Sequence, residues 1–201
     1  MHASTRHENI ELFCTSHITD VYSTVHETGN LPRLNNQGRR PEQVLYSWLR
    51  GHAMTRFLSP SLALLFDLEL ESIQDYGDDD FRSLETFRRT PKADLKLTYG
   101  THEIVIEVQS GFQGINDIKQ HKVLEAKRVA NEEGVVTVCM HFDVFNGQVA
   151  FVRLDTVAED NLNWITRQQM EGQTVFNIDQ GFFGWRIMNP LPQLAELDLG
   201  L

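Results

Sequence analysis

Hydrophobic and polar residues alternate along two short segments in the middle of the chain. Over 93–98, Leu95 and Leu97 alternate with polar residues, and over 104–109 three aliphatic residues recur at every second position. A period of two is typical of a half-buried strand. Between the segments, Gly100-Thr101 fits a two-residue hairpin turn of the Gly-X kind. The pattern therefore predicts two antiparallel strands joined by a tight turn.

The rest of the chain divides into helical and extended patterns separated by turn residues. The expected elements are helices over 4–28, 42–57, 117–131 and 155–170, and strands over 63–71, 135–145, 148–154 and within 174–187. This order predicts a mixed α/β fold. We expect one domain over 1–201, with a helical N-terminal part over 1–60, a core over about 61–155 and a C-terminal helix and strand over 156–201.

The composition is that of an ordinary globular protein. The 201 residues suffice to bury a core, and contents of 41% hydrophobic and 23% charged residues are typical. No apolar run could span a bilayer, and the first residues lack the apolar region of a signal peptide, so we expect a cytoplasmic protein with no membrane partner. Cys14 and Cys139 are too isolated for a disulfide framework or zinc site, and we expect buried thiols.

The charge is negative overall and unevenly spread. A formal net charge of −10 argues against a non-specific nucleic-acid coat protein, because phosphate binding needs positive charge. Residues 1–60 carry six arginines against five acids, whereas 67–80 hold seven acids and no base. The acidic block is most simply a solvated loop. A local basic face can coexist with it.

The expected hairpin brings two carboxylates together. With the turn at Gly100-Thr101, Asp94 lies directly opposite Glu107, with Cβ atoms roughly 4.5–5.5 Å apart. Carboxylates this close repel each other unless a cation lies between them, and Mg²⁺ prefers such oxygen ligands. The alternative is a pair of exposed strand carboxylates screened by solvent and a neighbouring lysine. A slip of one residue in register would place them on opposite faces.

These residues resemble a known nuclease core. Asp94, twelve intervening residues and Glu107-Val108-Gln109 are similar to the PD-(D/E)xK nuclease superfamily. More narrowly, the run 106–111, a helix bearing Lys and His, and then Gly134-Val135-Val136 resemble type II restriction endonucleases of the BglII kind, which have Glu-x-Gln in place of Glu-x-Lys. The resemblance covers about residues 90–140 and implies a restriction-endonuclease-like α/β core, with helices flanking a mixed central sheet.

The resemblance implies a role for each matching residue. Asp94 and Glu107 would bind Mg²⁺, with the Val108 carbonyl as a further ligand, and Gln109 would orient the attacking water or contact the scissile phosphate. Ala93 departs from the proline expected before the aspartate, and Gln109 from the lysine. Because a neutral amide is neither a base nor a cation, metal activation of water would carry more of the chemistry. The superfamily often adds a third acid, for which the candidates are Glu42, Glu69 and Glu71.

Two lysines near the start of the next helix offer the missing charge. Lys119 and Lys122 fall within the apolar arc of the helix expected over 117–131, close to the end of the Glu107 strand. We assign Lys119 to catalysis and Lys122 to DNA contact, although no sequence signal decides which ammonium replaces the absent lysine. Alternatively, both alkyl stems cover the edge of the sheet.

Two polar segments are candidates for DNA contact. Arg39 and Arg40 lie in an Arg- and Asn-rich loop, and such side chains read base edges in the major groove. Gln113 and Asn116 follow the catalytic strand in a glycine-containing segment. With the resemblance, the sequence predicts a Mg²⁺-dependent type II restriction endonuclease that cuts double-stranded DNA at a short specific site as a homodimer. The alternatives are a repair- or transposition-linked nuclease of the same fold and a catalytically inactive DNA-binding or scaffold domain.

Overall fold

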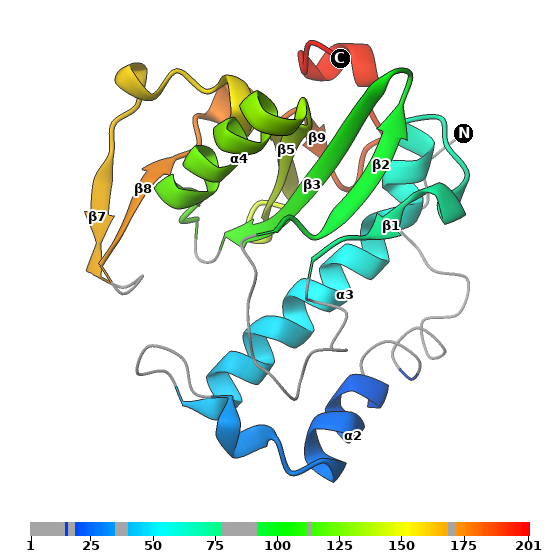
Figure 1. Cartoon of the computed structure of the whole chain (residues 1–201), viewed down its shortest axis with the longest axis vertical. Helices are drawn as coiled ribbons and strands as arrows, with labels where there is room; N and C mark the ends of the chain where they lie inside the picture. The colour runs from blue at the N-terminus through cyan, green and yellow to red at the C-terminus, as the bar shows by residue number, and fades with distance from the viewer. Residues whose placement is uncertain (1–14, 16–18, 35–39, 78–91, 112–113, 169–171) are drawn as a thin grey trace.

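A mixed sheet with helices on both faces forms the body of the protein (Figure 1). The computed structural model describes residues 15, 19–34, 40–77, 92–111, 114–168 and 172–201. The large sheet has the order β1 (Gln74–Asp75), β2 (Leu95–Tyr99), β3 (His102–Gly111), β5 (Val136–Asp143), β6 (Gln148–Arg153) and β9 (Trp185–Arg186). β3 and β5 run parallel and the other neighbours antiparallel. The expected mixed α/β architecture is thus confirmed.

The hairpin expected around Gly100 is confirmed, together with its register. Leu95 pairs with Ile106 and Leu97 with Ile104. Gly100 has φ +58°, which the first position of a Gly-X turn requires. Alternate residues of β3 therefore face opposite sides of the sheet, as the sequence pattern indicates.

The helix α3 (Pro41–Leu65) covers one face of the sheet. It begins at Pro41, one residue before the start expected from the sequence, but continues to Leu65. The strand expected over 63–71 is therefore wrong; a 3-10 turn, η3 (Leu70–Ser72), lies there instead. The apolar residues at the end of α3 are compatible, from sequence alone, with either a helix or a strand. The helix is favoured because Leu58 and Leu62, four residues apart, both pack into the core formed with β2, β3 and β5.

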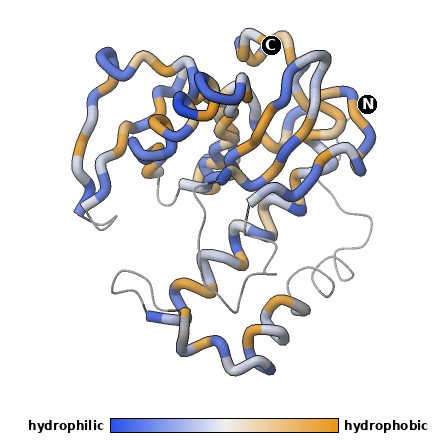
Figure 2. The backbone as a smooth tube through the Cα atoms, in the orientation of Figure 1, coloured by the Kyte–Doolittle hydropathy of each residue, from blue (hydrophilic) through white to orange (hydrophobic). Residues whose placement is uncertain are grey.

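The helix α4 (Gln120–Glu133) covers the opposite face, burying Val123 and Ala126 against β5 and β6. Its remaining surface is largely hydrophilic (Figure 2). The helix ends at Gly134, which has the left-handed conformation of a C-cap. The expected start at 117 is wrong, because Asp117–Lys119 forms strand β4 and pairs with β8 (Gln173–Asn177).

The three-stranded sheet β4-β8-β7 lies beside α4 (Figure 1). β7 (Ile165–Arg167) pairs with β8, so the helix expected over 155–170 is wrong; its described residues form β7 and the 3-10 turns η4 (Leu154–Thr156) and η5 (Glu159–Asn161). Pairing with a later strand decides this segment, and local periodicity does not reveal such pairing. The hairpin expected around Asn146-Gly147 is confirmed in β5 and β6.

A small helical unit precedes the sheet. α2 (Asp20–Glu27), η2 (Leu31–Arg33) and the first half of α3 share a separate apolar cluster that includes Val25, Leu34 and Val44. Figure 1 shows this unit extending away from the sheet. Most of the first half of the helix expected over 4–28 lies outside the described residues. No helix in the described ranges is long and apolar enough to cross a membrane.

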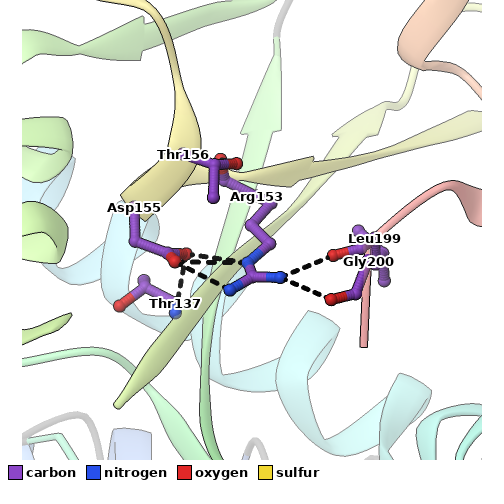
Figure 3. Close-up of polar contacts among 6 residues, drawn as sticks. All are labelled: Thr137, Arg153, Asp155, Thr156, Leu199 and Gly200. Carbon is purple, nitrogen blue, oxygen red and sulfur yellow. Dashed lines mark hydrogen bonds and ion pairs between the residues drawn. The ribbon is translucent and has the colours of Figure 1, made fainter. Parts of the chain in front are cut away.

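The C-terminal segment is fastened to β6 by one arginine (Figure 3). Arg153 donates through Nη1 to the carbonyl oxygens of Leu199 at 2.9 Å and Gly200 at 2.8 Å. Its Nη2 lies 3.1 Å from Oδ2 of Asp155, a mostly buried carboxylate that also accepts from the Thr137 amide. The arginine therefore ties together three segments that are distant in sequence.

Candidate active site

Backbone groups of β3 hold Asp94 at both its amide and its carboxylate. The ladder between β2 and β3 ends at the pair Leu95 and Ile106, so Asp94 lies one residue beyond the ladder rather than in a ladder pair with Glu107. Its amide donates to the Ile106 carbonyl oxygen at 3.0 Å, and its Oδ2 accepts from the Val108 amide at 2.5 Å. The carboxylate is thus held beside the strand segment that contains Glu107.

Glu107 lies in the middle of β3 and is 7% exposed. Its Oε2 accepts from Nζ of Lys122 at 2.8 Å, and its Oε1 accepts from Nε2 of Gln109 at 3.2 Å. A carboxylate this buried needs both hydrogen bonds and a countercharge. Gln109 and Lys122 therefore orient the Glu107 carboxylate.

The negative charges of Glu107 and Asp94 both act on the Cys139 thiol. Cys139 pairs with Glu107 in the β3–β5 ladder and is fully buried, as expected for a structural thiol. Burial raises the pKa of the Cys139 thiol well above its usual range, and the negative charges of Glu107 and Asp94 raise it further. Both carboxylates thus lie close enough to one thiol to disfavour its ionisation.

The backbone of β3 adds an oxygen on the Asp94 side. In an extended strand the N–H and C=O of one residue point toward the same neighbour. Because the Val108 amide meets Asp94, the Val108 carbonyl lies along that same edge. In the described part of the chain, no three His, Cys, Asp or Glu residues cluster as a metal site. The candidate third acids Glu42, Glu69 and Glu71 are exposed on α3, before η3 and in η3.

The two candidate lysines occupy different positions. Lys122 lies in the first turn of α4 and contacts Glu107, whereas Lys119 ends β4 and pairs with Val175. His121, between them, has a lowered pKa because of partial burial and the charges of Lys119 and Lys122, while Glu107 acts in the opposite direction. Positive charge at the start of α4 thus concentrates near Glu107, where the helix dipole adds to it.

Asn116 belongs to a buried hydrogen-bond network rather than to the surface. It is 7% exposed, its Nδ2 donates to Oδ2 of Asp143 at 3.1 Å, and its Oδ1 lies 3.2 Å from Nε2 of His141. Because the amide nitrogen already donates to Asp143, Oδ1 must accept, so the neutral His141 carries its proton on Nε2. The expected DNA contact by Asn116 does not fit this environment, because both ends of its amide are engaged inside the fold.

Burial keeps His141 neutral and leaves no room beside it. Burial lowers the His141 pKa to about 4, although Asp143 and Asp117 act in the opposite direction. A Cβ on Gly111 would collide with the Asn116 Oδ1 and lie 2.5 Å from the Ile115 carbonyl oxygen. The glycine at the end of β3 is therefore required by the close approach of the Ile115 backbone and the Asn116 side chain.

The remaining expected DNA contacts are placed only in part. Arg40 is exposed directly before α3, and its amide donates to Oε1 of Gln43 at 3.1 Å. Arg39 and Gln113 lie outside the described residues. In Figure 1 the first turn of α3 lies away from the sheet, so Arg40, directly before it, and the carboxylate pair belong to different parts of the molecule.

Comparisons with known proteins give little more than a fold-level likeness. No family model matches the sequence, and no curated protein does. Among solved structures, the chain is similar to a Holliday junction resolvase from Archaeoglobus fulgidus, with 15% identity and a TM-score of 0.40 over 67% of this chain and 87% of that one. A likeness this distant does not bear on activity, so the proposals below rest on the geometry of the site.

Sequence reasoning brought Asp94, Glu107, Val108 and Gln109 together but could not choose between the two lysines. It also did not single out His121, whose pKa is lowered by partial burial and by the nearby Lys119 and Lys122. The network of His141, Asn116 and Asp143 left no signal of its own, because Asn116 is distant in sequence from the other two residues and reaches them only in the folded chain.

Proposed function

We propose that the chain is a metal-dependent nuclease that hydrolyses DNA phosphodiester bonds at the Asp94–Glu107 site. The observation that supports this most is the contact of Lys122 with Glu107 at 2.8 Å. It places an ammonium beside a buried carboxylate at the edge where Asp94 and the Val108 carbonyl also lie. Two acids, a backbone carbonyl and a cation, gathered where β2 begins beside β3, fit the handling of a phosphate.

The donor set fits Mg²⁺. Asp94 and Glu107 would hold the ion with the Val108 carbonyl, leaving other positions for water and phosphate oxygens, as Mg²⁺ usually requires. A bound Mg²⁺ would supply positive charge and lower the pKa of a bound water.

The chain's own residues would bind and orient the reacting groups. The Lys122 ammonium, 19% exposed in its side chain, would contribute a cation to a scissile phosphate beside Glu107. Gln109 donates to Glu107 and would hold that carboxylate in one orientation rather than accept a proton. In this proposal Lys122, rather than Lys119, supplies the charge that Gln109 lacks.

The sequence predicts a finer function for this site, that of a homodimeric type II restriction endonuclease specific for a short site. A two-fold dimer would place one active site on each strand of a palindrome. Plasmid and linear DNA incubated with Mg²⁺ separate the possibilities. Discrete fragments support site-specific cleavage, a smear supports a nuclease without site specificity, and no cleavage of any DNA by the folded protein contradicts the nuclease proposal.

The residue assignment is tested with variants that keep the shape of each carboxylate. Asp94→Asn still accepts from the Val108 amide and Glu107→Gln keeps its volume, so both should fold while cleavage falls by about 10²–10³-fold or more. Glu103→Gln is the matched control, because Glu103 lies on the same strand but pairs with Lys96 at 2.7 Å. Normal cleavage by both site variants would show that the chemistry lies elsewhere.

A further inference from the structure

A cleft of about 280 Å³ opens between α4 and the sheet, directly beside the candidate active site. Glu107 and Lys122 line one end of it, so the cleft is continuous with the carboxylate pair. Toward the other end it is lined by Val129 and Glu133, near the end of α4. Any group bound in the cleft would therefore lie next to a phosphate held at Glu107.

The floor of the cleft is apolar. Ala93 and Val105 form part of it, and both are buried in one small cluster on which Val129 packs. Ala126 and Leu154, also buried, complete the apolar lining. Such a floor suits a flat apolar ring and gives an inorganic anion nothing to bind.

The wall opposite α4 combines an aromatic ring with ammonium groups. Tyr76 and Lys92 both line the cleft, and Nζ of Lys92 lies 5.1 Å from the centre of the Tyr76 ring. Nζ of Lys96, on β2, lies 5.5 Å from the same centre. Aromatic side chains interleaved with basic ones are the usual means of binding single nucleic-acid strands, since bases lie against rings and phosphates against cations.

We propose that this cleft binds one unpaired nucleotide next to the scissile phosphate, so that the enzyme acts on single-stranded DNA or on DNA with an unpaired nucleotide. The base would occupy the apolar floor, and its phosphates would lie between Lys92 and Lys122. This rests on the proposed nuclease function at the Asp94–Glu107 site and names its substrate class. It does not rest on the finer assignment as a restriction endonuclease, which would cut a fully paired site. A base stacked and paired inside a duplex cannot enter without leaving its partner, which costs least where the base is already unpaired.

Charge supports this occupant. The chain carries a formal net charge of −10, yet Lys92 and Lys122 both line this cleft, and Lys96, which pairs with Glu103, lies beside it. Three acids line it: Glu107 pairs with Lys122 and Glu125 with Arg128, both at 2.8 Å, and Glu133 is exposed near the end of α4. Three cations, Lys92, Lys122 and Arg128, balance these three acids, so the lining is formally neutral although the whole chain carries −10, and a phosphate meets less repulsion here than the net charge indicates.

Binding in Ca²⁺ tests the proposal without requiring cleavage. Fluorescence anisotropy would compare a single strand, its fully paired duplex, and that duplex with one unpaired nucleotide. Val129→Phe narrows the cleft, and the matched control is Leu124→Phe on the same helix, where the side chain is 50% exposed. Tyr76→Ala removes the aromatic wall, and Tyr76→Phe restores the ring.

The wild type should bind both unpaired substrates more tightly than the duplex. Val129→Phe and Tyr76→Ala should weaken binding of the unpaired substrates by roughly 5- to 100-fold, the range for losing one base contact, and change duplex binding less than about twofold. Leu124→Phe and Tyr76→Phe should bind as the wild type does. Preference for the perfect duplex, or unchanged binding by Val129→Phe, would overturn the proposal.

The two proposals can fail separately. Mg²⁺-dependent cleavage of every DNA form at equal rates, with equal affinities, would leave the nuclease assignment standing and remove the unpaired-nucleotide site. Selective binding of unpaired DNA without cleavage would do the reverse, leaving a strand-binding cleft on a protein without nuclease activity.

Discussion

Replacing Lys122 with methionine removes the ammonium that lies 2.8 Å from the Glu107 carboxylate but keeps most of the alkyl stem. The Lys122 and Glu107 side chains are 19% and 9% exposed, so the pair is largely but not fully shielded. A hydrogen bond to a charged partner contributes about 1.5–3 kcal/mol, and a fully buried pair costs more to break. Allowing for the partial exposure of Lys122, the free energy of unfolding without divalent cations should fall by about 2 kcal/mol.

The catalytic effect should exceed the effect on stability. If the ammonium stabilises charge on the phosphate, its loss should slow cleavage by about 10²–10³-fold. Single-turnover cleavage with excess enzyme in Mg²⁺ measures this step without product release. Thermal unfolding with and without Ca²⁺ measures the loss of stability. A bound cation would give Glu107 a new partner, so the difference in stability between Lys122→Met and the wild type should become smaller in Ca²⁺.

Lys127→Met is the matched control. Lys127 lies on the same helix and pairs with Glu159 at 2.7 Å, but both side chains are more than a quarter exposed, so its loss should cost less than about 1 kcal/mol and leave cleavage unchanged. Lys119→Met decides between the two candidate lysines. Normal cleavage by Lys122→Met with slow cleavage by Lys119→Met would move the role to Lys119. Normal rates in both would refute a displaced lysine.

Three further predictions concern the network behind the site. Asn116→Ala leaves His141 and Asp143 without their bridging amide and should cost about 2–4 kcal/mol in denaturant unfolding, whereas the exposed Asn163→Ala should have no measurable effect. Gly111→Ala forces a Cβ to within 2.5 Å of the Ile115 carbonyl oxygen and should lower the midpoint of thermal unfolding. Gly51→Ala, where nothing lies within 4 Å of the added Cβ, should lower it far less. Equal midpoints for the two variants would contradict the packing around Gly111. His141 should make stability fall by about 3 kcal/mol as the pH drops from 6.5 to 4, because the unfolded imidazole binds its proton near pH 6.5 and the folded one only near pH 4. His141→Gln should remove that part of the pH slope, and an unchanged slope would mean that the imidazole titrates normally.

The sequence alone determined the elements whose signals are local. The β2–β3 hairpin needs only alternation on either side of Gly100-Thr101, and its register brought Asp94 within reach of the Glu107 segment. The β5–β6 hairpin likewise follows from Asn146-Gly147. In both hairpins the interacting residues are close in the chain, so a tight turn fixes which side chains face each other.

Only the tertiary structure decided what depends on distant pairing. β4 forms because Ile118 pairs with Phe176, and this pairing delays the start of α4 to Gln120. That shift places Lys119 in the small sheet and leaves Lys122 on the helical turn that reaches Glu107. Which lysine contacts Glu107 therefore depends on a strand more than fifty residues further along the chain, and the helical periodicity around Lys119 and Lys122 does not indicate that strand.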